Sequence, residues 1–292
     1  MHLHLIDATY ELFRAFHALP PITAPDGTDV AAVYGLLSSA LSLLKDPTVT
    51  HLGCATDHTV ESFRNHLFAA YKTGDGMPEQ LAAQLPLAEE GLRALGLVVW
   101  PMIEFEADDA LAAAAHRHRD EFDKVVICSV DKDLAQCVRG DHVVLWDRRR
   151  EKVYDEPGVR AKWGVSPRSI PDLLALIGDV ADGLPGVPGW GQKSAAALLE
   201  VYDAVAAIPL DAAAWTRDGV KVRGAERLAR TLAERRDDAL LYRQLATLRT
   251  DVPLAESVAD LRWRGVPRDA FADFCRRMGF KRLPERPTRW AD

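Results

Sequence analysis

The chain has 292 residues, of which 48% are hydrophobic and 27% charged, and its formal net charge is −7. This length suffices for one large domain or two smaller ones, and no apolar run reaches the ~18–20 residues of a membrane span. No basic segment followed by an apolar stretch opens the chain, so we expect no signal peptide. The four scattered cysteines form no Cys-x-x-Cys pair, which argues against a zinc knuckle or a disulfide framework. We expect a cytoplasmic protein.

Short apolar runs predict buried parallel strands in the first half of the chain. Three of them, at residues 3–6, 50–55 and 125–129, are followed closely by an aspartate, and further strands are expected at 98–101 and 143–146. Helical patterns occupy residues 8–18, 30–45, 78–95 and 107–118. Strands that alternate with helices predict an α/β fold with a mostly parallel sheet flanked by helices.

The pattern changes near residue 165. From there we expect short helices separated by glycine and proline, a turn-rich stretch at 179–191, and a helix at 192–202. The Pro- and Arg-rich end, 283–292, is expected to fray. The sequence therefore predicts two domains, 1–165 and a mainly helical 166–292.

Nine acidic residues fall where such folds build sites. Four follow predicted strands, three open the helix that begins near residue 107, and two are spaced i, i+3 in the turn-rich stretch. They are Asp7, Asp57, Asp131, Asp133, Glu106, Asp108, Asp109, Asp179 and Asp182. Ligands of parallel sheets bind beyond the carboxyl ends of the strands. Without these nine carboxylates the net charge would be +2, so the acidic balance does not exclude a nucleic-acid partner.

Nine converging carboxylates would repel one another unless cations occupy the cluster or several members are protonated. Ligands that are all oxygen suit Mg²⁺ or Mn²⁺ better than zinc. Two such ions roughly 3.5–4 Å apart can clamp a phosphodiester. The alternative for the three helix-opening acids is a helix cap or dipole role, and for the others a role in shaping turns.

An ordered set of motifs resembles the 5′ nuclease family, which comprises the 5′→3′ exonuclease domain of bacterial DNA polymerase I and the stand-alone flap endonucleases. The motifs are Leu5-Ile6-Asp7, Phe13-Arg14-Ala15-Phe16-His17-Ala18, Ala32-Val33-Tyr34-Gly35, Ser62-Phe63-Arg64, Tyr71-Lys72, Glu106-Ala107-Asp108-Asp109, Asp131-Lys132-Asp133-Leu134, Asp182-Gly183-Leu184-Pro185-Gly186-Val187, and Gly189, Gly191 and Lys193-Ser194-Ala195. They occur in family order over residues 3–255.

The resemblance implies a resolvase-like (PIN-like) nuclease domain, with a helical arch near 70–95, followed by a helix–hairpin–helix region. It implies a monomeric, Mg²⁺- or Mn²⁺-dependent 5′→3′ exonuclease or flap endonuclease acting on branched, flapped, nicked or 5′-ended DNA. One ion would draw on Asp7, Asp57, Glu106 and Asp108, and a second on Asp133, Asp179 and Asp182, with Asp109 and Asp131 between them.

The same resemblance implies roles at the substrate. Lys72 would meet the scissile phosphate, with Arg64 as a second phosphate contact, Asp131 in the catalytic group, and Tyr71 stacked on an unpaired base. Arg14 would face either the substrate or an acidic partner in the core. The hairpin of Gly189, Gly191 and Lys193 would bind DNA phosphates and hold K⁺ through backbone carbonyls. The plain alternatives are surface side chains and a glycine-rich turn.

Two departures and three alternatives stay open. Ala8 stands where the family often has glycine, and Asp75 lies near the place of an arch arginine. No polymerase domain follows residue 292 in the sequence, so a stand-alone nuclease is expected. A catalytically weak branched-DNA binding protein, a PIN-type ribonuclease and an aspartate-based phosphotransferase remain possible. Trp190, at the hairpin tip, is a further candidate for stacking.

Overall fold

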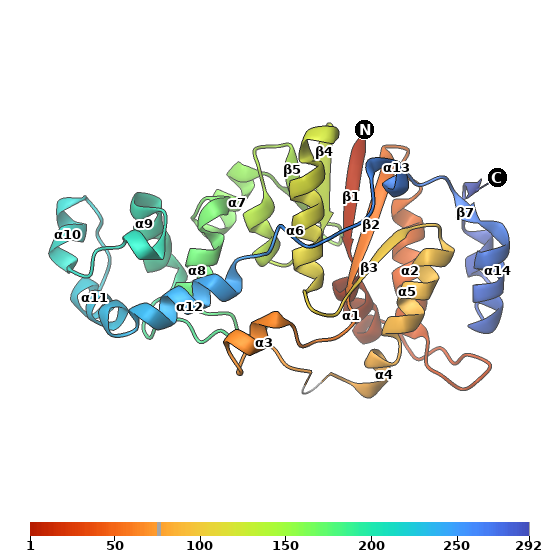
Figure 1. Cartoon of the computed structure of the whole chain (residues 1–292), viewed down its shortest axis with the longest axis horizontal. Coiled ribbons are helices and arrows are strands. Elements are labelled where there is room, and N and C mark those ends of the chain that lie inside the picture. The colour runs from red at the N-terminus through yellow and green to blue at the C-terminus, as the bar shows by residue number, and fades with distance from the viewer. Residues whose placement is uncertain (75–76, 292) are drawn as a thin grey trace. The chain divides into compact units, whose positions relative to one another are not determined.

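The computed structural model describes residues 1–74 and 77–291, which form two compact units (Figure 1). Unit 1 consists of residues 1–62, 74–129 and 249–292, and unit 2 of residues 63–73 and 130–248. Each unit is thus assembled from segments far apart in the sequence. The expectation for Asp75 falls outside the described residues.

Unit 1 contains four parallel strands in the order β3-β2-β1-β4. They are β1 (His2–Asp7), β2 (Val49–Asp57), β3 (Val98–Met102) and β4 (Lys124–Cys128). Ile6 of β1 pairs with Cys54 of β2 and with Cys128 of β4. The chain runs outward from β1 to β3 and returns on the other side of β1 to form β4. The carboxyl ends of β1 and β4 therefore lie at a topological switch point, where open parallel sheets bind ligands.

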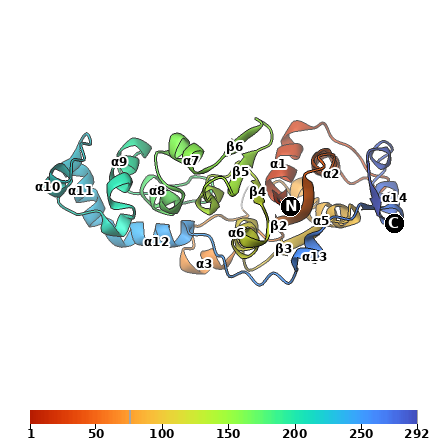
Figure 2. The same cartoon turned by 90° about the horizontal axis from the view of Figure 1, so that it is seen from above.

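Helices cover both faces of these strands (Figure 2). Helices α1 (Ala8–Ala18) and α2 (Ala31–Leu43) lie on one face, with α5 (Leu85–Ala94) packed against α2 and β3. Helix α6 (Ala107–His118) covers the other face. Its buried side is almost entirely alanine from Ala110 to Ala115, and such small side chains let the helix approach the strands closely. The four strands and helices α1, α2 and α6 lie where the sequence predicts them.

The helix expected over residues 78–95 is instead two helices, α4 (Glu79–Ala82) and α5. Pro86 lies in the first turn of α5, where it lacks the N–H that a continuous helix would need. The buried Gln84 fills the break, and its Oε1 accepts hydrogen bonds from the N–H groups of Ala32 and Val33 at 3.0 and 3.3 Å. Gln84 thereby satisfies backbone donors at the start of α2.

The end of the chain is ordered rather than frayed, which corrects the expectation for residues 283–291. After α13 (Val258–Leu261), β7 (Val266–Pro267) pairs in parallel with β8 (Trp290–Ala291). Between them α14 (Arg268–Arg277) packs on α5. The Arg268 guanidinium lies 4.3 Å from the centre of the Trp290 ring, a cation–π contact that composition alone does not reveal.

Unit 2 joins a strand hairpin to a set of short helices (Figure 1). Strands β5 (Val143–Asp147) and β6 (Lys152–Tyr154) pair antiparallel. The helices are α3 (Phe63–Leu67), α7 (Glu156–Trp163), α8 (Ile170–Ile177), α9 (Gln192–Tyr202), α10 (Ala212–Arg217), α11 (Ala225–Glu234) and α12 (Arg236–Ala246). Trp215 is fully buried, and its ring meets that of Trp190 edge-on at 6.0 Å.

Candidate functional site

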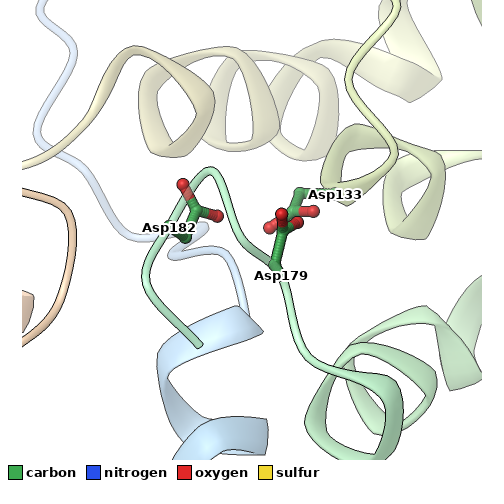
Figure 3. Close-up of side chains that lie close together, drawn as sticks. All are labelled: Asp133, Asp179 and Asp182. Atoms are coloured by element: carbon green, nitrogen blue, oxygen red, sulfur yellow. The ribbon is translucent and has the colours of Figure 1, made fainter. Parts of the chain in front are cut away.

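Three of the nine predicted carboxylates lie together in unit 2. One carboxylate oxygen from each of Asp133, Asp179 and Asp182 lies within 4.8 Å of the others (Figure 3). Asp133 opens a short 3-10 helix, Asp179 follows the glycine that ends α8, and Asp182 lies in the turn that comes next. We call Asp133, Asp179 and Asp182 the acidic trio. Oxygen ligands from these two segments suit a hard divalent cation.

Asp133 is the member that most needs a cation. It is 4% exposed, and its buried Oδ1 has no hydrogen-bond partner among the described residues. Burial, together with the charges of Asp131, Asp182 and Asp179, raises the pKa of Asp133 well above its ordinary value. A buried carboxylate that lacks a donor is costly, so a bound ion fits this arrangement.

Lys132 already supplies one positive charge to the acidic trio. Its Nζ lies 2.5 Å from Oδ2 of Asp179. Burial lowers the pKa of Lys132, but the hydrogen bond with Asp179 and the charges of Asp179, Asp133 and Asp131 outweigh burial, and the net pKa is raised. The ammonium group pairs with Asp179, and no described residue donates a hydrogen bond to Oδ1 of Asp133.

The loop that carries Asp179 and Asp182 is fixed by its own backbone. Oδ1 of Asp179 accepts a hydrogen bond from the N–H of Ala181 at 3.1 Å. Gly183 has φ +70°, and a Cβ there would lie 2.5 Å from the carbonyl oxygen of Ala70, so only glycine fits. This close approach brings the segment before Tyr71 against the loop. The N–H of Lys72 donates to the carbonyl of Asp182 at 3.0 Å, which anchors Lys72 beside the acidic trio.

Asp7 lies at the switch point of unit 1. It is the N-cap of α1, where its Oδ1 accepts a hydrogen bond from the N–H of Tyr10 at 2.8 Å. Its Oδ2 accepts from the hydroxyl of Ser129, just after β4, at 2.7 Å. The carboxylate of Asp7 therefore links the ends of β1 and β4, as the sequence places it.

Asp57 and Glu106 also lie in unit 1, and each accepts a hydrogen bond from a neighbouring segment. Oδ1 of Asp57 accepts from the N–H of Ala107 at 2.9 Å, at the beginning of α6. Oε1 of Glu106 accepts from the Ser62 hydroxyl at 2.7 Å. Behind Asp57, the buried Glu89 bonds to both Thr56 and His58 at 2.9 Å and fixes the end of β2. Asp108 is partly exposed in the first turn of α6.

Asp109 is held by backbone donors at the start of α6. It is fully buried, and its Oδ2 accepts from the backbone N–H of Glu106 at 3.1 Å, which completes a capping box at α6. Its Oδ1 accepts from the N–H of Arg249 at 2.8 Å. Both contacts favour the helix-cap alternative left open above, and a metal-ligand role for Asp109 stays a prediction.

Three predicted substrate contacts have partners within the protein. Arg64 is 1% exposed and donates to the carbonyls of Leu245 and Thr247 at 2.7 and 3.3 Å. The Tyr71 ring is 3% exposed and lies 5.9 Å from the Arg64 guanidinium. Arg14, with a side chain that is 33% exposed, pairs with the buried Glu11, which is the acidic partner named as its alternative. In this conformation Arg64 and Tyr71 are buried, and the roles of all three residues at the substrate stay predictions.

The predicted hairpin connects the acidic trio's loop to α9. Gly189 has φ +84°, and Gly191 caps α9, with no atom within 4 Å of the place of a Cβ. Lys193 is exposed in the first turn of α9. The guanidinium of Arg227, on α11, lies 3.7 Å from the Cβ position of Gly189, so two cations flank this turn. No motif of the sequence includes Arg227, so its place beside the turn emerges from the structure.

The Trp190 ring faces the interior of unit 2, so it does not offer the stacking surface that the sequence suggests. Its ring is buried, and its indole N–H donates to the carbonyl of Leu228 at 3.3 Å. An exposed aromatic ring is instead found at Phe13, which belongs to one of the family motifs but received no role from the sequence. Its ring is 48% exposed and meets the ring of His17 at 4.5 Å on α1. The i, i+4 spacing of the pair, opposite the buried Leu12 and Ala15, is the signal that could have found it.

Comparison with known proteins defines the class of this fold and site. Residues 2–164 match the family model described as the 5′-3′ exonuclease, N-terminal resolvase-like domain, and residues 165–269 match the 5′-3′ exonuclease, C-terminal SAM fold. The chain belongs to the 5′→3′ exonuclease family. The predicted family and fold class, a mostly parallel resolvase-like sheet followed by a helical region, are confirmed.

Individual relatives agree with this assignment. The chain is 38% identical to DNA polymerase I of Pseudomonas aeruginosa over 289 residues, which cover 96% of this chain and 30% of the polymerase. The chain thus spans about a third of that relative. The phage T5 D15 protein co-crystallised with metal ions shares the fold, with a TM-score of 0.69 at 19% identity over 98% of this chain and 99% of the other. A T5 D15 flap endonuclease variant in complex with DNA and metal ions has a TM-score of 0.68 at 19% identity, over 98% of this chain and 100% of the other.

No helix in the described part of the chain combines the length and the apolar character that crossing a membrane requires.

Proposed function

We propose that this chain is a metal-dependent 5′ nuclease that hydrolyses phosphodiesters in branched, flapped, nicked or 5′-ended DNA. The observation that carries the proposal is the acidic trio, with the buried Oδ1 of Asp133 lacking any donor among the described residues. A protein that only bound DNA would have no need of a buried carboxylate oxygen without a hydrogen-bond donor, because such a group destabilises the fold. The family of the chain supports the reaction class.

The ions are proposed to be Mg²⁺ or Mn²⁺. The trio, with Asp131 beside it, would hold one ion, and Asp7, Asp57, Glu106 and Asp108 would hold the other. When bound, such ions supply Lewis-acid chemistry that activates water and stabilises the leaving oxygen. The relatives of the same fold from phage T5 were solved with metal ions, in one case together with DNA, which supports both partners. That the two groups of carboxylates form a single cluster stays a prediction.

The remaining residues are proposed to bind and orient the substrate. The backbone of Lys72 is anchored next to Asp182, so its ammonium group can neutralise the scissile phosphate. The turn of Gly189 and Gly191, with Lys193 and Arg227, would bind phosphates of duplex DNA and hold K⁺ through its carbonyls. The exposed ring of Phe13 offers a face on which a terminal or unpaired base can stack.

We further propose the division of labour predicted above, with residues 1–165 carrying the nuclease domain and 166–292 the DNA-binding region. The protein is proposed to act as a monomer in the cytoplasm. Sedimentation of the free chain and of its complex with a flap substrate would test whether the protein is a monomer, since a dimer would have twice the protein mass.

The test is cleavage of labelled 5′-flap, nicked, gapped and single-stranded DNA with Mg²⁺, with Mn²⁺ and with chelator. We expect products with a 5′-phosphate and a 3′-hydroxyl that require a divalent ion. Asp131→Ala and Asp179→Ala should abolish cleavage while the circular dichroism spectrum persists. Asp141→Asn, an exposed carboxylate of unit 2, is the matched control.

Full Mg²⁺-dependent activity in both alanine variants would overturn the assignment. Flap binding without any cleavage by the wild-type chain would favour the non-catalytic alternative. Parallel reactions with RNA and with a phosphomonoester would expose a ribonuclease or a phosphotransferase.

A further inference from the structure

We infer that Lys132 is an exchangeable internal cation of the acidic trio, which neutralises Asp179 in the metal-free protein and is displaced when a divalent ion binds. This inference rests on the metal-binding part of the proposed function. It assigns to Lys132 a role in setting metal affinity, apart from any contact with DNA.

The first observation is that Lys132 and a metal ion would use the same oxygen-rich side chain. Oδ1 of Asp179 accepts a hydrogen bond from Ala181, and Oδ2 holds the Lys132 ammonium at 2.5 Å. Both oxygens of Asp179 are therefore engaged in the structure. A cation bound by the trio must share or replace the contact with Lys132.

The second observation is that the Lys132 ammonium group can reach water when it leaves Asp179. Its side chain is 35% exposed, and the four-carbon stem of lysine gives the ammonium group several rotamers that reach water. Asp179, by contrast, is buried and fixed by its turn. The carboxylate stays in place when the ammonium moves, as the ligand of a preorganised site should.

The third observation concerns the charge that remains. Lys132 bonds to Asp179, whereas the buried Oδ1 of Asp133 has no hydrogen-bond partner among the described residues. A divalent ion supplies two charges and a ligand position for Asp133, so exchange is favourable overall. Lys132 nevertheless lowers the repulsion in the metal-free chain, and the ion must compete with it.

The inference predicts that metal affinity and metal-free stability change in opposite directions. Removal of the lysine charge frees Oδ2 of Asp179, so a divalent ion binds more tightly, while the metal-free trio loses the ammonium group that pairs with Asp179. A lysine with a merely structural role would weaken both together, because a damaged loop would bind metal less well. The opposite signs separate the two explanations.

The experiment titrates the full chain with Mn²⁺ by calorimetry and measures the melting temperature with chelator and with Mn²⁺. For Lys132→Met we expect about tenfold tighter binding of one Mn²⁺ ion, as expected when a partly buried charged competitor is removed. We also expect a lower melting temperature in chelator and a larger rise on addition of Mn²⁺. Lys132→Gln serves as a second variant if the first does not fold.

Two controls calibrate the result. Lys132→Arg keeps the charge and should bind Mn²⁺ close to the wild-type affinity, and Lys221→Met removes an exposed lysine of unit 2 and should change neither quantity. Unchanged or weaker Mn²⁺ binding in Lys132→Met and Lys132→Gln would overturn the inference. Because no DNA is present, its failure is distinct from failure of the nuclease proposal, which the flap assay decides.

Discussion

Two buried charged residues of unit 2 show how hydrogen-bond partners decide a residue's role. The guanidinium of Arg64 donates to two backbone carbonyls, whereas Oδ1 of Asp133 receives no hydrogen bond from the described residues. A satisfied buried charge stabilises the fold, and an unsatisfied one implies a ligand. Both residues belong to motifs of the family, so sequence alone could not tell them apart.

Arg64→Ala is expected to destabilise the chain by about 3 kcal/mol, because two buried carbonyls lose a charged donor and a cavity remains. Arg139→Ala, an exposed arginine of the same unit, should change the free energy of unfolding by less than about 0.5 kcal/mol. Urea denaturation followed by circular dichroism measures both. An Arg64→Ala protein of wild-type stability that binds DNA poorly would restore the phosphate contact.

The raised pKa of Asp133 predicts a pH dependence of stability in metal-free buffer. The folded chain holds this proton more tightly than the unfolded chain, so stability is lost as pH rises from the unfolded-state pKa through the folded-state pKa. Asp133→Asn cannot ionise and lacks this loss. Denaturation at several pH values with chelator should show the variant gaining on the wild type as pH rises, and a constant difference would contradict the assignment.

Phe13→Ala is expected to weaken binding of DNA with an unpaired or frayed end by about 1–3 kcal/mol through lost stacking, with little effect on stability because the ring is exposed. Phe13→Trp should retain the affinity. Fluorescence anisotropy with a flap substrate, and with the same substrate carrying abasic sites at its end, measures the effect. If abasic substrates respond to Phe13→Ala as strongly as normal ones, stacking is not the cause.

At the scale of the element, the hairpin before α9 is anchored by the hydrogen bond from the Trp190 indole to the Leu228 carbonyl. Lys193 and Arg227 flank it. The buried indole fixes the turn, and the glycines leave its outer surface open. Such a turn contacts phosphates without reading base sequence.

The double variant Lys193→Ala with Arg227→Ala is expected to reduce the slope of log K against log salt concentration by about 2, since each phosphate contact contributes about 0.9. The binding of different sequences should weaken equally. Arg139→Ala is the control, and its slope should equal that of the wild type. An unchanged slope in the double variant would remove the hairpin from the DNA interface.

Elements with strong local signals could be predicted from the sequence. The bounds of α1, α6 and α9 match the expected ranges because Asp7, Glu106 and Gly191 mark their beginnings. The sequence-based prediction missed the break between α4 and α5, although Pro86 is typical of the first turn of a helix. The pairing of β7 with β8 could not be predicted, because two-residue strands have no periodicity and depend on contacts across the chain.

Within the site, residue types and spacing identified all three members of the acidic trio. Residue types and spacing could not show that Lys132 forms a salt bridge with Asp179 or that Asp109 caps α6. Burial of Arg64 and Tyr71 likewise depends on segments distant in sequence, such as residues 245–247. Sequence therefore indicates which residues gather, whereas the partner of each oxygen requires the structure.

At the scale of the whole molecule, α14 completes the core of unit 1 although it lies more than 100 residues after β4. A Cβ at Gly91 would lie 2.9 Å from the ring of Phe274 and 2.9 Å from Leu37. The buried ring therefore packs on α5 where only glycine leaves room, and the end of the chain contributes to the core of the sheet domain.

Phe274→Ala is expected to cost about 3–5 kcal/mol, as for other fully buried aromatic side chains. Phe274→Leu should cost less, because most of the volume is kept. Thermal unfolding of the metal-free protein measures both. A loss below about 1 kcal/mol for Phe274→Ala would mean that α14 contributes little to the core.

The interleaving of segments limits how the polypeptide can be divided. Unit 1 is interrupted at residues 63–73 and again at 130–248, so no single peptide-bond cut releases it whole. A truncation after residue 165 would remove α14 and expose the surface of α5 around Gly91 to water. The sheet unit therefore depends on the last α-helix of the chain, and loss of α14 would damage a core that begins with the first strands.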